Sequence, residues 1–161
     1  MEFLDIVNDN DEVIGPASRD EIYEKLLPHR IVHILIFNDK NEMALQLRSK
    51  KVSFAPLHWC TAVGGHVQSG ESYEAAALRE CKEELGIRSE LKIVGKEIYK
   101  VDGRPKKFLT IFSAQYNGPF VKDEHDVERV EFFPLEKIKE MVANNEKLHP
   151  ELLFILQKYF V

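Results

Sequence analysis

Three glutamates, Glu80, Glu83 and Glu84, lie close together in a segment whose apolar residues recur with helical spacing. At about 100° per residue the three carboxylates share one arc of the predicted helix. Like charges four positions apart, such as Glu80 and Glu84, cost ~0.2–0.5 kcal/mol on an exposed helix. A hard divalent cation would offset this repulsion, because Mg²⁺ prefers oxygen ligands and keeps waters that substrate phosphates can replace. The alternative, from spacing alone, is a solvated acidic helix face.

The segment before this helix contains Gly64, Gly65 and Gly70. Glycine lets the backbone approach a ligand closely, so a backbone carbonyl could join the coordination of a cation. The glycines add modestly to the metal interpretation, and from the residues alone a solvated acidic face stays the more common outcome.

The pattern across residues 65–87 resembles the Nudix box. Its fixed positions are Gly65-x5-Glu71-x7-Arg79-Glu80-Cys81-x-Glu83-Glu84-x-Gly86-Ile87. Cys81 is one departure, because the family usually has an aliphatic residue there. A buried cysteine behaves as a small hydrophobic residue, so this departure does not argue against activity.

The resemblance implies a hydrolase that cleaves a diphosphate linkage by attack of water on phosphorus, with Mg²⁺ or Mn²⁺. It implies that Glu80 and Glu84 are metal ligands and that Glu83 is a further ligand or the base that orients the water. The carbonyl of Gly65 would complete the ligand set. Metal ions in such a site polarise the phosphoryl group and stabilise the leaving oxygen.

Two further features are placed by the same resemblance. Arg79 would hold the loop and helix together by pairing with Glu71 or with a glutamate of the helix. A second base often lies in a loop after the main strands, where this chain has the acidic turn 123–126. Glu124 or Asp126 could serve, and a solvated acidic turn is the alternative.

The resemblance extends to the branch related to isopentenyl-diphosphate isomerase. It rests on residues 5–7, 13–15 and 29–30, and on Trp59 followed by 64–66 and 70–71. That branch includes isomerases, which need a cysteine in the pocket, and hydrolase-like relatives. Gly64 stands where the isomerase has that cysteine. We therefore favour hydrolysis, with an isopentenyl-diphosphate delta-isomerase-like protein as the alternative.

Other isomerase positions also differ. Pro105 and Lys107 stand where the isomerase has an acidic pair, and Ile22 replaces one histidine ligand. His29 and His66 have counterparts among the isomerase ligands. They are either residual ligands or donors to a substrate phosphate, or they are structural. His33, within an apolar strand, is expected to be a core histidine with its hydrogen bonds satisfied.

Two clusters of cations stand out in a chain of net charge −5. One contains Arg48, Lys50 and Lys51, and the other Arg104, Lys106 and Lys107. Arginine suits bidentate phosphate contacts and lysine acts as a point charge. One cluster is expected to bind the phosphate that is not hydrolysed, and solvated turns are the alternative. The predicted substrate-binding residues are Arg48, His66, Lys107 and Glu124.

Two aromatic residues, Trp59 and Tyr99, have side chains that could stack on a nucleotide base. An aromatic side chain in a strand is more often part of the core. We therefore expect both rings to be core residues unless the structure places them in the pocket.

These residues must be positioned by strands interleaved with a few helices. Apolar periodicity, capping boxes and glycine or proline stops predict helices over 18–27, 72–85, 135–143 and 149–160. The predicted strands cover 3–7, 12–14, 31–37, 43–47, 59–63, 91–101, 107–116 and 130–133. We expect an α/β fold, a Nudix-type α/β/α sandwich with a mixed β-sheet and a short N-terminal β extension over 1–28, all within one domain, 1–161.

Composition sets the remaining expectations. The 161 residues are 44% hydrophobic and 30% charged, which is ordinary globular usage. The acidic balance argues against general nucleic-acid binding, which weakens an RNA-end processing role. The intact glutamates disfavour a catalytically silent binding module. With no signal segment, no membrane span and two cysteines, we expect a cytoplasmic enzyme. Its expected partner is a small diphosphate-containing substrate, and the sequence is compatible with a homodimer.

Overall fold

A parallel pair of long strands, β3 (His29–Phe37) and β8 (Lys107–Gln115), forms the centre of the sheet in this computed structural model, which describes residues 2–160. Their register runs from His29 opposite Lys107 to Phe37 opposite Gln115. Both strands are buried along almost their whole length. Parallel strands covered on both faces read as near-continuous apolar runs, which is why β3 carries the sequence Ile-Val-His-Ile-Leu-Ile-Phe.

Seven more strands complete a nine-stranded mixed sheet. They are β1 (Phe3–Val7), β2 (Val13–Ser18), β4 (Met43–Arg48), β5 (Trp59–Thr61), β6 (Val63–His66), β7 (Lys92–Tyr99) and β9 (Val127–Phe133). Strand β6 pairs antiparallel with β3, β7 with β8, and both β5 and β9 with β4. The N-terminal pair β1 and β2 joins the sheet through β3.

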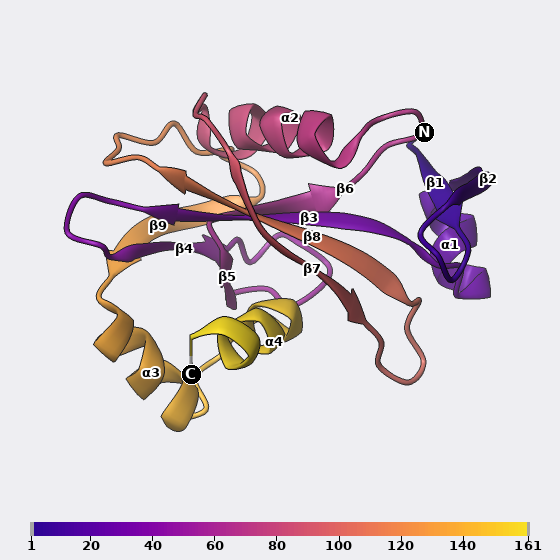
Figure 1. Cartoon of the computed structure of the whole chain (residues 1–161). Coiled ribbons are helices and arrows are strands. Elements are labelled where there is room, and N and C mark those ends of the chain that lie inside the picture. The colour runs from indigo at the N-terminus through magenta and orange to yellow at the C-terminus, as the bar shows by residue number, and fades with distance from the viewer. Residues whose placement is uncertain (1, 161) are drawn as a thin grey trace.

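Helices cover both faces of this sheet (Figure 1). Helix α2 (Tyr73–Leu85) lies on one face, and α3 (Leu135–Ala143) and α4 (Pro150–Tyr159) lie on the other. A short helix, α1 (Arg19–Lys25), lies beside β1 and β2 at one end. Alternate residues of β3 supply the two cores, Ile34 on the α2 side and Leu35 on the α3 and α4 side. The expected α/β/α sandwich with a mixed sheet is confirmed.

The local signals for helix ends are confirmed. Ser18 accepts a hydrogen bond from the backbone N–H of Glu21 at 3.2 Å, and Ser72 accepts one from Ala75 at 3.0 Å. Gly86 ends α2 in the left-handed conformation, with φ of 64°. These caps fix where α2 begins and ends, and hence which way its glutamates project.

Two local expectations were wrong. The strand predicted over 59–63 is two strands, and β6 continues through Gly64 and Gly65 to His66 because their backbones pair with β3. Strand β2 runs on through Pro16, which an edge strand tolerates.

The residues of α2 differ in burial. Leu78 is 44% exposed, whereas Ala76 is fully buried. The small side chain of Ala76 lets α2 lie close to the sheet, and on the glutamate arc Glu80 is largely buried while Glu83 stays exposed.

Among residues 2–160, no helix combines the length and the apolar character that a membrane span requires.

Candidate active site

One cavity of about 940 Å³ collects side chains from most of the segments that the sequence singled out. Its lining includes the glutamates of α2, strand β6, the loop between β4 and β5, the hairpin between β7 and β8, and α1. Such a volume accommodates a ligand the size of a nucleotide conjugate. The cavity has acidic groups near α2 and cationic and aromatic groups near the β7–β8 hairpin.

Arg79 joins the loop after β6 to helix α2. Its guanidinium donates to both carboxylate oxygens of Glu71, at 2.7 and 2.9 Å, and to the carbonyl oxygen of His66 at 3.0 Å. Its Nη1 also donates to Glu80 at 2.8 Å and to Glu83 at 3.1 Å. Both partner sets expected for Arg79 therefore occur together. The hydrogen bond to Glu71 raises the pKa of Arg79 and lowers that of Glu71.

Glu84 is the most deeply placed carboxylate of the three. Its Oε1 accepts a hydrogen bond from Gln46 at 3.0 Å, whereas its Oε2 is buried and has no hydrogen-bond partner within residues 2–160. Burial raises the pKa of Glu84 well above its usual range, and it also raises that of Glu80. A buried carboxylate oxygen without a partner is costly. A cation bound there would remove that cost.

Gly65 brings the backbone of β6 against Glu80. A Cβ built on Gly65 would lie 2.5 Å from the carboxyl carbon of Glu80, so no side chain fits there. The close approach is the one that a carbonyl ligand beside Glu80 needs. Within residues 2–160 no three acidic, histidine or cysteine side chains are arranged closely enough to hold a metal ion, and Glu80 and Glu83 both pair with Arg79. The all-oxygen donor set and the unpartnered oxygen of Glu84 fit Mg²⁺ or Mn²⁺.

Gly65→Ala tests this close approach. The added methyl group must displace the Glu80 carboxylate. We therefore expect activity with saturating Mg²⁺ to fall by ~10–100-fold, the loss typical when a group that positions a metal ligand is changed. Gly15→Ala is the matched control, because nothing lies within 4 Å of a Cβ there. Steady-state rates for both variants check the expectation, and equal rates would remove Gly65 from the site.

In the acidic turn 123–126, the side chain of Asp126 lines the cavity, whereas that of Glu124, which was predicted to bind substrate, points to solvent. The Glu124 side chain is 86% exposed and pairs with Lys122 at 3.0 Å, while Asp126 lines the cavity. The backbone N–H of Asp123 donates to the Glu84 carbonyl at 2.8 Å, which holds the turn against the end of α2. Of the two candidates for a second base, Asp126 is therefore the one that faces the cavity.

Lys107 lines the cavity but is held in a buried network. Its Nζ donates to Oε2 of Glu151 at 2.8 Å, and Glu151 Oε1 bonds with Nε2 of His33 at 2.9 Å. His33 Nδ1 bonds with the Thr61 hydroxyl at 2.7 Å, so both ring nitrogens have partners, as expected for a core histidine. Burial acts to raise the pKa of Glu151, but His33 and Lys107 outweigh it and the pKa is lowered.

His29 and His66 stack on each other, with ring centroids 5.5 Å apart. Nδ1 of His29 donates to the Leu27 carbonyl at 3.0 Å, and Nε2 of His66 bonds with the Tyr23 hydroxyl at 2.9 Å. Nε2 of His29 is buried without a partner among residues 2–160. Burial lowers the pKa of His29 to about 4 and that of His66 to about 3. Both rings are therefore neutral at pH 7.

Because these histidines are buried in the neutral form, we expect the free energy of unfolding to decrease at acid pH. Burial lowers the pKa of His149 to about 3 as well. The unfolded chain binds protons near pH 6.5, before the folded one does, so stability is complete above pH 6.5 and is lost as pH falls toward 4. Each histidine contributes at most ~1.36 kcal/mol per pH unit. We expect His66→Gln to reduce the fall in urea midpoint between pH 7 and pH 5, and exposed His125→Gln to leave it unchanged; equal falls would contradict the assignment.

The two cation clusters divide between the cavity and the surface. Arg48, Lys51 and Arg104 line the cavity, and Nε of Arg48 donates to the Phe54 carbonyl at 3.0 Å. Lys106 instead pairs with the exposed Asp9 at 3.2 Å.

Trp59 and Tyr99 pack in T-shaped contacts against Phe133 and Phe154. Trp59 packs against the core on the α3 and α4 side, as expected, whereas Tyr99 is half-buried outside the core clusters, and neither ring is among the residues that line the cavity.

Sequence reasoning missed several cavity residues, namely Tyr23, Gln46, Phe54, His149 and Glu151. They come from elements far apart in the chain, and none belongs to a recognisable motif. Glu151 in particular reads as an ordinary acidic residue in the first turn of α4. A buried position for it follows only from the packing of α4 on the sheet.

Comparisons with known proteins identify the family of this chain. The NUDIX domain family matches residues 27–152. YfcD of Escherichia coli K12, described as an uncharacterized Nudix hydrolase, is 32% identical over 85% of this chain and 76% of its own length. The Nudix hydrolase all7351 of Nostoc is 30% identical over 99% of this chain and 96% of its own length. The crystal structure of DR0079 from Deinococcus radiodurans covers 99% of this chain and 100% of its own, with a TM-score of 0.85 and 24% identity. Because the NUDIX domain model matches most of the chain and these relatives match it along most of their length, the chain belongs to the Nudix hydrolase family.

Proposed function

We propose that this protein uses Mg²⁺ or Mn²⁺ to hydrolyse the diphosphate linkage of a nucleoside diphosphate joined to another group. The observation that carries the proposal is the buried, unpartnered Oε2 of Glu84 beside Glu80 and the close-packed Gly65. Glu80, Glu84 and the Gly65 carbonyl would hold the cation. When bound, it supplies positive charge that polarises the phosphoryl group and stabilises the leaving oxygen.

The chain's own side chains divide the remaining work. Glu83 is the most exposed of the three glutamates, 58% against 14% for Glu80, and it is a further ligand or the base that orients the attacking water. Arg79 balances the charge of Glu71 and Glu80 and keeps the loop on the helix. Arg48, which also lines the cavity, would bind a phosphate oxygen of the substrate.

Isomerase chemistry has less support. Gly64 offers no thiol, and a Cβ there would already meet Nδ1 of His33 at 3.2 Å. Cys60 also lines the cavity, but burial raises the pKa of its thiol to about 12. Lys107, where the isomerase has an acid, is paired with Glu151. The relatives reported above are named as hydrolases.

Cleavage of a panel of substrates, followed by chromatography of the phosphorylated products, tests the function. The panel contains nucleotide sugars, dinucleotide cofactors, nucleoside triphosphates and isopentenyl diphosphate, each with Mg²⁺ and with Mn²⁺. We expect metal-dependent cleavage of one diphosphate class. Migration of the double bond in isopentenyl diphosphate, with no cleavage of any compound, would replace the proposal by the isomerase.

A further inference from the structure

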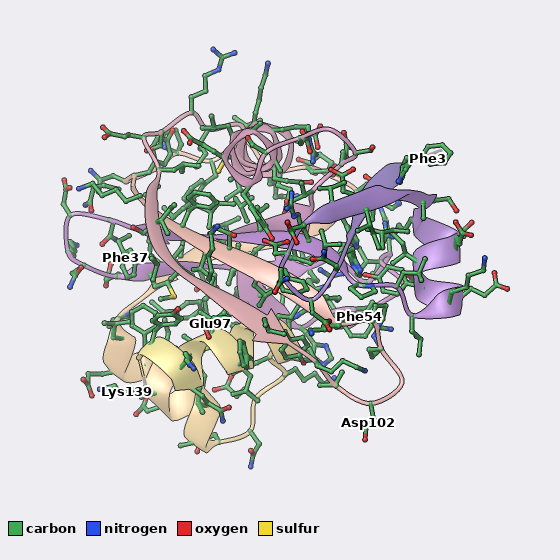
Figure 2. All side chains as sticks on the ribbon, turned by 45° about the vertical axis from the view of Figure 1, so that its right-hand side comes forward. Phe3, Phe37, Phe54, Glu97, Asp102 and Lys139 are labelled. Carbon is green, nitrogen blue, oxygen red and sulfur yellow. The ribbon has the colours of Figure 1, made fainter. Side chains whose placement is uncertain are left out.

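Three segments meet where the cavity approaches the β7–β8 hairpin. Helix α1 contributes Tyr23, the β4–β5 loop contributes Phe54, and the hairpin contributes Arg104. Figure 2 shows Phe54 near this hairpin, whose tip carries Asp102, while α2 lies at the opposite end of the view. Cζ of Arg104 lies 5.3 Å from the centre of the Tyr23 ring and 4.5 Å from the centre of the Phe54 ring. We call these three residues the aromatic clamp.

The guanidinium of Arg104 is the uncommitted charge of the hairpin. Within residues 2–160 it forms neither an ion pair nor a side-chain hydrogen bond; only the backbone carbonyl of Arg104 accepts one, from Lys100. Its two cationic neighbours are engaged, Lys106 with Asp9 at 3.2 Å and Lys107 with Glu151 at 2.8 Å. Of the three hairpin cations that sequence grouped together, Arg104 alone combines a cavity position with unused donors.

The clamp holds the guanidinium beside two aromatic rings and leaves its N–H donors available. Aromatic rings attract a guanidinium through its charge and do not take up its hydrogen-bond donors. Donors in a planar fork match the two oxygens of a phosphate or a carboxylate. The Tyr23 hydroxyl is bonded to His66 at 2.9 Å, and His66 ends the strand that carries Gly65. The clamp is therefore tied to the backbone that adjoins Glu80.

We propose that Arg104, held by Tyr23 and Phe54, binds an anionic group that the substrate carries beyond the diphosphate to be cleaved. This assignment rests on the proposed function and narrows its substrate class to diphosphates whose second moiety bears a phosphate or a carboxylate. Tyr23 precedes the matched NUDIX domain, which begins at residue 27. The N-terminal unit of β1, β2 and α1 thus supplies one wall of a specificity site.

Matched pairs of ligands that differ by one anionic group test the assignment. The phosphate pairs are NADPH with NADH and coenzyme A with its dephospho form, and the carboxylate pair is UDP-glucuronate with UDP-glucose. Dissociation constants measured by calorimetry without added metal avoid turnover. We expect the wild type to prefer the more anionic member of at least one pair by at least ~10-fold, as for a hydrogen bond to a charged group. The pair that responds identifies phosphate or carboxylate.

Two variants decide whether Arg104 causes the preference. We expect Arg104→Gln to reduce the ratio within the responding pair to about 1, and Lys106→Gln, on the same hairpin, to keep it. Ratios near 1 for every pair in the wild type, a preference that survives Arg104→Gln, or no binding of any anionic member would each overturn the proposal. Failure of the hydrolase proposal is visible separately, as absence of cleavage of the whole panel with Mg²⁺ and Mn²⁺.

Discussion

Glu84→Gln is expected to reduce metal-dependent hydrolysis by about 10³-fold, equivalent to roughly 4 kcal/mol of transition-state stabilisation. The amide keeps the shape of the side chain and its contact with Gln46, but it removes the negative charge that a cation needs. Because burial already raises the pKa of Glu84, the neutral amide removes a desolvation cost from the metal-free protein. The variant should therefore fold at least as stably as the wild type.

Thermal unfolding with and without Mg²⁺ separates loss of metal from loss of fold. Saturating Mg²⁺ should stabilise the wild type by ~2.7 kcal/mol at a hundredfold excess over Kd, and it should stabilise Glu84→Gln far less. Glu74→Gln, in the exposed first turn of α2, is the matched control and should behave as the wild type in both assays. Full activity of Glu84→Gln would exclude Glu84 as a metal ligand.

Lys107→Met is expected to destabilise the protein by about 3 kcal/mol, because it leaves Glu151 buried with His33 as its remaining partner. The side chains of Lys107 and Glu151 are only 8% and 6% exposed, so solvent screens their pairing little. At ~2–4 °C per kcal/mol for a domain of this size, Tm should fall by roughly 6–12 °C. Differential scanning calorimetry measures this directly.

Two comparisons show whether the ion pair is the cause. Lys107→Met combined with Glu151→Leu removes both charges and should recover most of the lost stability. Lys106→Met should change stability by less than ~0.5 kcal/mol, since its partner Asp9 is 90% exposed. An unchanged Tm with a raised KM for Lys107→Met would instead make Lys107 a substrate ligand, as the sequence suggested.

The end of the cavity that carries the three glutamates was predictable because the sequence pattern that forms it is local. The Nudix pattern of residues 65–87 lies on one loop and one helix, so spacing along the chain sets spacing in space. Ser72 and Gly86 fix the two ends of α2, and the 3.6-residue repeat then brings Glu80, Glu83 and Glu84 to one arc. The apolar run of β3 likewise identified a buried strand without any tertiary information.

Exposure and pairing could not be predicted in the same way. Spacing did not show that Arg79 pairs at once with Glu71, Glu80 and Glu83. It also did not show that Oε2 of Glu84 has no hydrogen-bond partner among residues 2–160. Both facts depend on how closely Ala76 and Gly65 let α2 and β6 approach. Sequence named the carboxylates, and packing decided their environments.

The other end of the cavity was decided by tertiary structure alone. Arg104, Lys106 and Lys107 are near neighbours in sequence, yet one contacts two aromatic rings, one pairs with an exposed aspartate and one is buried with Glu151. Their partners come from α1, the β4–β5 loop, the β1–β2 turn and α4, which no local pattern connects. The charge of a side chain follows from its residue type. Its interaction partner depends on the tertiary structure, because the sheet and helices bring distant segments together.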